Sequence, residues 1–600
     1  MIDWRAPAAR AQRTGLGVVL LLGALDAWRY INYQANPDGV SYIDLARAFA
    51  QHGPTALVNG YWSPLFPGLI GTTYRALPPT IDTLYPIAHI VAFALFVVTT
   101  LVFHRLLTAV RERLGLVADT PDVVQVLIVA VAWSSYALYI LKGIGVQLMT
   151  PDMGVSAIAF WIAAESLSLG AERWPTERWI RAGVVLGIGY WWKAILFPVG
   201  LAWYAMALFV AWRRRDGMRG PAAGAFGYAA LALLLVVPIS LQVGRITFGE
   251  TGRLNYLWYA NGAPYVWERC RPAGVGDASA EPFGRIMRDS VIVETPLTCR
   301  LSSPAAGATM PLWDDPSRYY RDAHTRVDVV RQMRAIRNNL TSLGNEIGTI
   351  GPVLFVALAI IGLIATVSLA RRPGRAEEHL RRAAAALLFA LTAAPVAFYL
   401  LVYVEFRHLA PFFMITWVFV PWLAVLAWGS RARFAIALLA VTALADVVTK
   451  MSDQTLMGLA LARGAVTGRA PDRVPTTQVV ARALRAAGIA PATRVASLNN
   501  EWNPEWAQLA ELRIRAHVPQ WTTALPTVLV ALRDSCARAA WDAALRASGI
   551  EAVVARIPVG LPIPPEFEQL AQTGFYLHRV AAIAAPCAAQ RGGAPTRSSS

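Results

Sequence analysis

The residues best suited to chemistry in this sequence lie between Asn36 and Gly71. This stretch carries two acids, Asp38 and Asp44, between two apolar segments of the chain. A carboxylate can take the proton of an attacking hydroxyl, which is general base catalysis. Prolines at positions 54, 64 and 67 prevent one continuous helix from running through the stretch. We therefore expect a shaped loop at a membrane surface that presents an acid.

Helical geometry separates the two acids. We expect an amphipathic helix from Val40 to Gln51. Asp38 then shares a face with Tyr42, whereas Asp44 lies roughly 240° round the helix from Asp38. One acid must therefore act alone or with a partner from elsewhere in the chain. Asp38 precedes Gly39, which permits a bend that would turn the carboxylate into a cavity, but Asp38 could equally be the N-cap of the helix.

Two short patterns in this stretch resemble a known family. Pro37–Tyr42 has the pattern Pro-Asp-Gly-x-x-Tyr, and Gly60–Pro67 reads Gly-Tyr-Trp-Ser-Pro-Leu-Phe-Pro. Together they resemble the first extracytoplasmic loop of the C-type glycosyltransferase (GT-C) superfamily, and more narrowly the branch of protein O-mannosyltransferases and lipid A aminoarabinose transferases. The resemblance implies that Asp38 is the catalytic base. The other substrate-binding candidates of this loop are Asp44, Tyr61 and Trp62.

Lys193 and Asp152 are charged residues at or inside predicted spans. An ionisable residue within a span costs roughly 2.5 to 3.5 kcal/mol, so Lys193 is a functional candidate. A similar glycine-to-lysine stretch in the superfamily branch implies contact with lipid phosphate, although a lysine can also snorkel outward. Asp152 follows Pro151 in a favourable helix start, which is a structural role in itself. An acid in the second outer loop recurs in the family and implies substrate or metal binding by Asp152.

Two further basic segments could hold a phosphate. Arg407 and His408 end an apolar span on the predicted outer face, and the planar fork of an arginine suits phosphate oxygens. Lipid headgroups are the alternative partner for Arg407. Arg253 lies in a loop over 244–349, which is long enough to be functional and is rich in glycine and aromatic residues. Such a loop suits a lid or cleft wall over a sugar, and an ordinary surface loop is the alternative.

Composition indicates a polytopic membrane protein. Of the 600 residues 56% are hydrophobic and only 16% are charged, and the mean hydropathy is +0.43, whereas about a quarter of the residues in soluble proteins are charged. The net charge of +17 does not indicate nucleic acid as a partner, because the arginines cluster between apolar spans. The sequence has no P-loop, dinucleotide-binding glycine motif, zinc-protease motif or cysteine metal spacing.

Apolar segments of about 20 residues are the length that a bilayer requires. We expect about eleven crossings, at 15–33, 81–103, 123–141, 151–169, 182–197, 200–212, 223–243, 350–369, 383–404, 409–428 and 434–448. With the N-terminus inside, every cytoplasmic loop of this topology is rich in arginine. A cleavable signal peptide could also explain the first segment, but we expect a retained helix because it anchors the loop that carries Asp38.

All four cysteines fall in segments that this topology places outside, where disulfides can form. We expect one disulfide between Cys270 and Cys299 in the long loop, and one between Cys536 and Cys587 near the C-terminus. Four free thiols are the alternative.

The chain changes character after Thr449. Segment 477–488 has helical spacing, and 494–498, 552–556 and 575–580 are patterned as short strands. The fold class that we expect is therefore a polytopic α-helical membrane domain over 1–449, GT-C-like, followed by a small extracytoplasmic α/β domain over 450–590. The tail over 591–600 is expected to be disordered.

A site that faces outward has no nucleotide sugars, so a sugar donor must arrive on a membrane lipid such as polyprenyl phosphate. We predict an inverting glycosyltransferase of a bacterial inner (plasma) membrane that acts on a hydroxyl of a glycan, lipid or protein, with Asp38 as base. Lys193, Arg407 and Arg253 would hold the leaving phosphate. A divalent cation bound by Asp38 and Asp152 is a further option. The alternative function is a transporter or flippase of a lipid-linked or polar solute.

Overall fold

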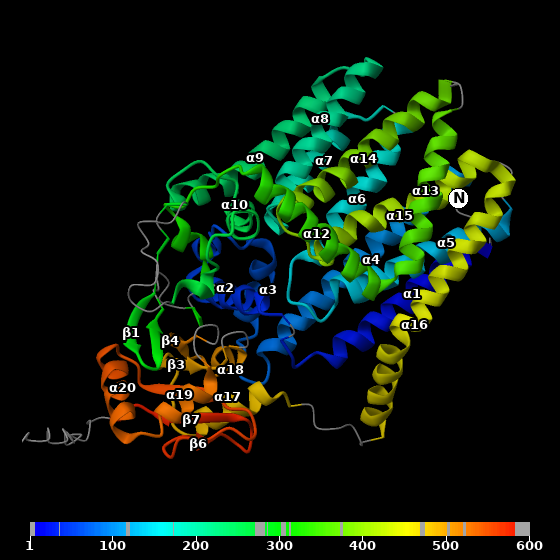
Figure 1. Ribbon diagram of the computed structural model, residues 1–600. Coiled ribbons are helices and arrows are strands. Elements are labelled where there is room, and N and C mark those ends of the chain that lie inside the picture. The colour runs from blue at the N-terminus through cyan, green and yellow to red at the C-terminus, as the bar shows by residue number, and fades with distance from the viewer. Residues whose placement is uncertain are drawn as a thin grey trace, which may run out of the picture. The chain divides into compact units, whose positions relative to one another are not determined.

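The computed structural model describes residues 7–34, 36–115, 121–171, 173–270, 283–284, 286–287, 289–301, 308–310, 314–371, 376–467, 474–500, 504–519 and 524–581. The chain forms two compact units (Figure 1). The first, Met1–Ala263 with Asp315–Arg473, is called the helical unit below. The second, Pro264–Asp314 with Val474–Ser600, is called the sheet unit.

Each of the eleven predicted spans overlaps a helix of the helical unit. These helices are α1 (Pro7–Arg29), α4 (Leu84–Gly115), α5 (Asp122–Ala137), α6 (Asp152–Ala171), α7 (Thr176–Trp192), α8 (Leu196–Arg214), α9 (Arg219–Val243), α13 (Pro352–Ala370), α14 (Ala376–Val402), α15 (Phe406–Trp428) and α16 (Ala432–Val466). The connections contain α2 (Asp38–His52), α3 (Leu65–Ala76), α10 (Thr251–Asn255) and α12 (Val329–Ile350). Short 3-10 or π-helical segments are η1 (Pro54–Leu57), η2 (Leu138–Ile144), η3 (Tyr256–Ala260), η6 (Pro316–Tyr320) and η7 (Gly429–Arg431).

Six helical stretches among the described residues are long and apolar enough to cross a membrane, or seven if α12 and α13, which are bent by 114°, form one span. One of the six, Phe406–Leu461, runs through both α15 and α16. Helix α7 is not among them, and its 17 residues are at the short end of what a bilayer requires. The protein is thus a multi-pass membrane protein, and eleven crossings remain a prediction.

Glycines allow close helix packing at two places that position the site. A Cβ atom on Gly71 of α3 would lie 2.5 Å from the carbonyl oxygen of Ala46 in α2, so only glycine fits between these helices. A Cβ atom on Gly183 of α7 would likewise clash with the carbonyl oxygen of Gly224 in α9. The first contact places the helix that begins at Asp38, and the second places the helix that ends just before Lys193.

The fifth predicted span is wrong at its C-terminal end. We expected one helix through to Phe197, but α7 ends at Trp192 and α8 begins at Leu196. Lys193 between them is extended, with φ −161° and ψ 135°. The apolar residues on both sides hide this break from a hydropathy pattern. Lys193 therefore lies at a helix end and not inside a continuous helix.

The sheet unit contains a mixed seven-stranded sheet in the order β1-β2-β4-β3-β5-β7-β6. Its strands are β1 (Ser290–Glu294), β2 (Leu297–Arg300), β3 (Arg494–Leu498), β4 (Arg513–Val518), β5 (Ala552–Arg556), β6 (Glu568–Gln569) and β7 (Phe575–Arg579). Its helices are η4 (Val266–Arg269), α17 (Thr476–Ala486), α18 (Glu505–Leu509), α19 (Leu525–Ala531) and α20 (Ser535–Ala547). The strands predicted at 494–498, 552–556 and 575–580 are confirmed as β3, β5 and β7.

The boundary between the units differs from the expected one. The predicted domain start at residue 450 falls inside α16, which continues to Val466. Part of the predicted long loop supplies β1 and β2, which join the C-terminal strands because β2 pairs antiparallel with β4. This segment of the loop is therefore an edge of the sheet.

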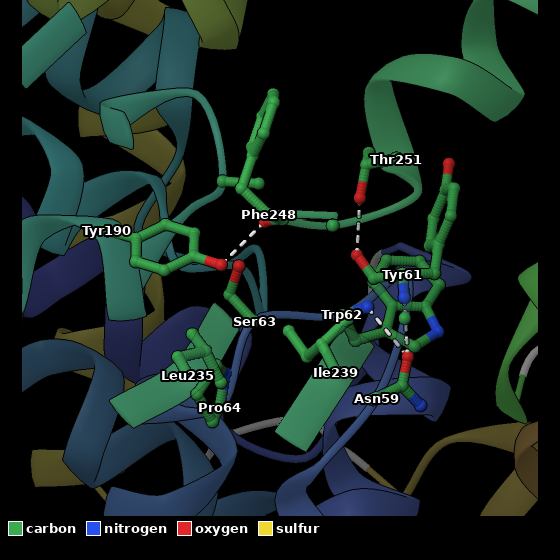
Figure 2. Close-up of a pocket in the computed structure, with 13 residues that line it drawn as sticks. Asn59, Tyr61, Trp62, Ser63, Pro64, Tyr190, Leu235, Ile239, Phe248 and Thr251 are labelled. Carbon is green, nitrogen blue, oxygen red and sulfur yellow. Dashed lines mark hydrogen bonds between the residues drawn. The ribbon is translucent and has the colours of Figure 1, made fainter. Parts of the chain in front are cut away.

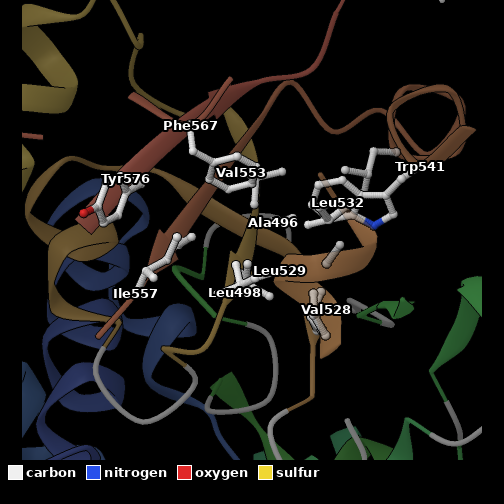
Figure 3. Packing of buried hydrophobic residues seen from close by; sticks show 14 of the residues in the cluster. Ala496, Leu498, Val528, Leu529, Leu532, Trp541, Val553, Ile557, Phe567 and Tyr576 are labelled. Carbon is white, nitrogen blue, oxygen red and sulfur yellow. The ribbon is translucent and has the colours of Figure 1, made fainter. Parts of the chain in front are cut away.

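An apolar core fills one face of the sheet. Figure 3 shows Trp541 of α20 and Leu529 of α19 packed with Leu498 of β3 and Val553 of β5. The indole N–H of Trp541 donates to the hydroxyl of Thr298 in β2 at 2.9 Å, which ties the loop-derived strand to α20. The hydrophobic effect of these large side chains stabilises the unit.

The predicted disulfide between Cys270 and Cys299 is confirmed, with Cα atoms 5.8 Å apart. Both cysteines belong to the sheet unit and are fully buried. Cys587 and the predicted tail over 591–600 lie outside the described residues. The pairing of Cys536 with Cys587 therefore stays a prediction.

Candidate active site

Asp38 is the first residue of α2. The N-cap is Pro37 and no side chain caps the helix, so the interpretation of Asp38 as N-cap is wrong. Its backbone N–H donates to Oδ1 of Asn36 at 2.8 Å, which fixes the entry into the helix. A carboxylate in the first turn is stabilised by the helix dipole. The side chain is thereby available for contacts outside its own helix.

The side chain of Asp38 contacts Arg407 of α15. Its Nη2 donates to Oδ2 of Asp38 at 2.7 Å, and its Nε donates to Oε2 of Glu405. The guanidinium is 13% exposed and so is enclosed between two carboxylates. A planar fork can bind two anions in this way, whereas a lysine ammonium is a point charge. The first outer loop and the start of α15 are joined here across 369 residues of sequence.

Glu405 is a site residue that the sequence analysis missed. It is the N-cap residue of α15, and the hydroxyl of Tyr403 donates to its Oε1 at 2.5 Å. Burial would raise the pKa of Glu405, but the charge of Arg407 and the hydrogen bond from Tyr403 outweigh it and lower the pKa to about 2. Its position two residues before Arg407 was the available signal.

Lys193 and Asp152 form a second ion pair. The Nζ of Lys193 donates to Oδ1 of Asp152 at 2.6 Å. Asp152 is the first residue of α6 and is almost completely buried, and its Oδ2 has no hydrogen-bond partner among the described residues. The break between α7 and α8 is what brings the ammonium group of Lys193 to this helix start.

The two ion pairs form one cluster, which we call the outer charge cluster: Asp38, Arg407, Glu405, Asp152 and Lys193. Asp152 interacts electrostatically with Arg407 and His408 as well as with Lys193. His408 stacks on Tyr399 at a centroid distance of 5.0 Å, with Nε2 3.9 Å from Oε2 of Glu405.

The environment of Tyr42, one turn after Asp38 on α2, also shows that Asp38 and Asp152 lie close together. Burial raises the pKa of Tyr42 well above its ordinary value, and the charges of Asp38 and Asp152 add to this effect. Both acids therefore act on a single hydroxyl group, although they come from different predicted outer loops.

Tyr61 and Trp62 form an aromatic wall beside the cluster. The ring of Trp62 packs edge-on against Tyr42 and Tyr61, at centroid distances of 5.1 and 4.7 Å. The hydroxyl of Tyr61 donates to Oδ1 of Asn255 at 3.3 Å. Burial, followed by the charge of Asp38, raises the pKa of Tyr61 well above its ordinary value. Both predicted aromatics thus lie close to Asp38.

A small pocket is lined in part by Tyr61 and Trp62 (Figure 2). Tyr190 in this pocket donates to the carbonyl oxygen of Phe248 at 2.6 Å, and Thr251 donates to the carbonyl oxygen of Tyr61 at 2.6 Å. Its lining also includes Ala194, the residue after Lys193. The pocket is mostly apolar and therefore suits the apolar part of a ligand.

The structure does not bring Asp44 and Arg253 into the cluster. Asp44 instead lies near Tyr74, where its charge and the opposite charge of Arg47 both act on the hydroxyl group of that tyrosine. Arg253 donates from Nε to Glu250 at 2.6 Å, and from Nη1 and Nη2 to the carbonyl oxygens of Ala323 and Tyr320 at 2.6 and 3.0 Å. Its guanidinium therefore ties loop segments together, and substrate binding by Asp44 and Arg253 stays a prediction.

The donor set does not fit a divalent cation. Arg407 contacts Asp38 and Lys193 contacts Asp152, so each acid proposed as a ligand already has a cation beside it. Among the described residues no group of three or more histidines, cysteines or acids is placed to hold a metal ion. We derive no step through a metal.

Comparison with known proteins gives structural similarity only. No family model matches the sequence, and no curated protein matches it. The structure is similar to the oligosaccharyltransferase of Archaeoglobus fulgidus, solved with zinc and sulfate, with 11% identity over 90% of this chain and 68% of that chain and a TM-score of 0.41. It is also similar to ArnT from Cupriavidus metallidurans, with 13% identity in the apo state and 12% in the structure bound to undecaprenyl phosphate. Both ArnT comparisons cover 95% of this chain and 98% of that chain, with a TM-score of 0.37.

With 11 to 13% identity and TM-scores of 0.37 to 0.41, these similarities carry no argument about the activity of this chain. Function is therefore inferred from the residues of the outer charge cluster.

Proposed function

We propose that this protein is a membrane glycosyltransferase that moves a sugar from a polyprenyl-phosphate donor to an acceptor hydroxyl on the extracytoplasmic face, with inversion at the anomeric carbon. One observation carries the proposal: the acid Asp38 and the cations Arg407 and Lys193 belong to one cluster, although they come from three distant parts of the chain. Glycosyl transfer from a phosphate needs this combination of a base and cations.

Asp38 is the base in this proposal. Its Oδ2 is held by Arg407, while Oδ1 makes no hydrogen bond with the described residues and the side chain is 24% exposed. The acceptor hydroxyl would donate its proton to Oδ1 as its oxygen bonds to the anomeric carbon and the bond from that carbon to the phosphate oxygen breaks. A single displacement of this kind inverts the configuration.

Arg407 and Lys193 stabilise the leaving phosphate. Nη1 of Arg407 makes no hydrogen bond with the described residues, and the Nζ of Lys193 has three donor positions, of which Asp152 takes one. These donors can bind phosphate oxygens as negative charge develops on them.

The distribution of arginine supports an outward-facing site. The segments that contain Asp38, Asp152 and Glu405 are all outside in the topology with a cytoplasmic N-terminus. Because α7 ends at Trp192, Lys193 lies at the outer end of that helix in the same topology. A lipid-linked donor is therefore required on this side.

The test is an assay of sugar release from a radiolabelled polyprenyl-phosphate sugar by the purified protein in liposomes. We expect Asp38→Asn to abolish transfer and Asp82→Asn, an exposed acid at the start of the second predicted span, to leave it unchanged. Transfer at the normal rate by Asp38→Asn would overturn the assignment. Uptake of the intact lipid without sugar release would indicate a flippase instead.

A further inference from the structure

A second polar cluster lies in the sheet unit. The strands β4, β3 and β5 run parallel, with Leu498 of β3 paired to Val518 of β4 and to Ala555 of β5. Their carboxyl ends therefore meet at one edge of the sheet. In α/β sheets this edge is where ligands bind, because the loops that leave the strands can present side chains there.

The side chains at this edge point away from the apolar core. Leu498 and Ala496 belong to the core, so Ser497 between them faces the opposite side of the sheet. Ala555 is also a core residue, so Arg556 after it points to the same side as Ser497. The helix α18, which follows β3 in the chain, contacts β4.

Four residues here carry buried polar atoms with no hydrogen-bond partner among the described residues. These atoms are Oγ of Ser497, both polar atoms of the Asn500 amide, Oε2 of Glu505 and Nε1 of Trp506. Ser497 and Asn500 are only 0% and 3% exposed. Nearly all buried polar groups in proteins are paired, because an unpaired buried group loses its hydrogen bonds to water without replacement. Four such residues within ten positions indicate that something polar completes them.

Two interactions of Arg556, the last residue of β5, show that the loop after β3 and the helix α18 lie near the end of β5. Asn499 is in the left-handed region, with φ 57°, and its Nδ2 donates to the carbonyl oxygen of Arg556 at 2.7 Å. The charge of Arg556 also acts on Glu505. Asn500 follows directly after the first of these contacts, so Asn500 and Glu505 both lie next to the end of β5.

We propose that this edge of the sheet unit is a binding site for a neutral carbohydrate, whose hydroxyl groups pair with Ser497, Asn500, Glu505 and Trp506. A sugar hydroxyl both donates and accepts a hydrogen bond, which matches an amide, a hydroxyl, an indole N–H and a carboxyl group. These residues belong to the sheet unit and the outer charge cluster belongs to the helical unit, and the proposal does not depend on the transferase activity.

The carboxyl group of Glu505 fits a neutral ligand. Burial raises its pKa to about 7, so near neutral pH it can either donate or accept a hydrogen bond. An anionic ligand would meet a partly charged carboxylate at this position, whereas a sugar hydroxyl pairs with either form.

The experiment uses the full-length protein in a detergent without a sugar headgroup. The probes are the methyl glycosides of mannose, glucose and galactose, followed by saturation-transfer NMR, with glycerol as a polyol control. We expect at least one glycoside to bind, and Asn500→Leu to weaken this binding about tenfold, since one hydrogen bond contributes up to about 1.5 kcal/mol. The melting temperature should not fall, because Asn500→Leu removes an unpaired buried amide.

Matched variants distinguish binding at this edge from binding elsewhere on the protein. Glu568→Gln changes an exposed acid of β6 and should not alter binding. Asp38→Asn should bind the glycoside normally while losing transfer, so failure of one proposal can be told from failure of the other. If Asn500→Leu lowers the melting temperature, Ser497→Ala decides, because it deletes a hydroxyl without adding bulk.

Four results would overturn the proposal. They are no binding of any glycoside, equal binding of glycerol, unchanged binding in both Asn500→Leu and Ser497→Ala, and an experimental structure in which ordered water alone pairs with these groups in the presence of the sugar. Ordered water is the ordinary partner of such groups in proteins without a ligand.

Discussion

The helical unit contains a second cluster of charge that contrasts with the outer charge cluster. Glu165 of α6 lies 2.6 Å from Arg105 of α4 and 3.9 Å from Arg181 of α7. We call Glu165, Arg105 and Arg181 the inner cluster. Its carboxylate is 3% exposed, and its arginines are about half exposed, 55% and 52%. In the outer charge cluster Arg407 is enclosed and the carboxylates of Asp38 and Glu405 are the more exposed partners.

The two clusters differ in how exposed their carboxylates are. The carboxylate of Glu165 is only 3% exposed, and its two cations also lie over the ring of Trp161 at 5.9 and 5.8 Å. Such a pair joins three helices and has a structural role. Asp38 is held from one side only, so a hydroxyl can approach its other oxygen.

The largest expected effect is the difference in transfer rate between variants of Asp38 and Glu165. Asp38→Asn should lower the rate of transfer about 100- to 10,000-fold, the usual contribution of a general base. Glu165→Gln should leave the rate unchanged, because Glu165 is buried and is not part of the outer charge cluster. Both rates are measured with a radiolabelled polyprenyl-phosphate sugar. Equal losses in the two variants would mean that the clusters do not differ in function.

The next effect concerns the stability of the second ion pair. Lys193→Met should lower the free energy of unfolding by about 3 kcal/mol, because Asp152 is then a buried charge without a partner. The double variant Lys193→Met with Asp152→Asn should recover part of this loss. Thermal unfolding in detergent measures both. A double variant as unstable as Lys193→Met alone would show that pairing is not the cause.

A smaller effect is expected from the shape of the cation. Arg407→Lys keeps the charge but removes the planar fork that joins Asp38 and Glu405. We expect kcat/KM for the donor to fall about tenfold, since a hydrogen bond to a charged group contributes about 1.5 to 3 kcal/mol. Arg105→Lys in the inner cluster is the matched control and should keep its activity. Unchanged kinetics in Arg407→Lys would contradict a role for the fork.

The smallest effect is a shift in acid stability. The pKa of Glu405 is about 2 in the folded protein and 4.5 ordinarily, so its ionisation stabilises the fold above about pH 4.5, and this stabilisation is lost as the pH falls through 2. Tyr403→Phe removes a hydrogen bond to Glu405 and should raise that pKa. The midpoint of acid unfolding should then move to a higher pH.

Tyr190→Phe is the control for that measurement. Its hydroxyl donates to a backbone carbonyl and not to an acid. This variant should lower the free energy of unfolding by the same amount at every acidic pH. The midpoint of acid unfolding should move only as far as this uniform loss requires. A similar shift in both variants would show that Glu405 is not the titrating group.

The sequence analysis was most successful where structure is local. Strands β3 and β5 have the predicted bounds, because the pattern of a buried strand is contained in five residues. The place of β1 and β2 in this sheet was missed because β2, which pairs with β1, also pairs with β4 more than 200 positions away, and no local pattern reports such a partner. The end of α7 was missed because apolar residues continue on both sides of Lys193.

The candidate site shows the same division. A short motif indicated Asp38, and the types and positions of Asp152, Lys193 and Arg407 marked them as candidates. Which cation contacts which acid could not be derived, since Asp38 and Arg407 are 369 positions apart. Glu405 was overlooked because its role depends on enclosure beside Arg407, which only the packing of α15 produces.

Composition and periodicity by themselves determined that this chain is a multi-pass membrane protein with an α/β unit near its end and a few charged residues too costly to be incidental. Those properties follow from transfer free energies and from repeats of a few residues, so they can be read along the chain. Only the tertiary structure decided the pairing of the charges, the break at Lys193 and the neutral polar edge of the sheet. These depend on contacts between distant segments, which exist only after the chain has folded.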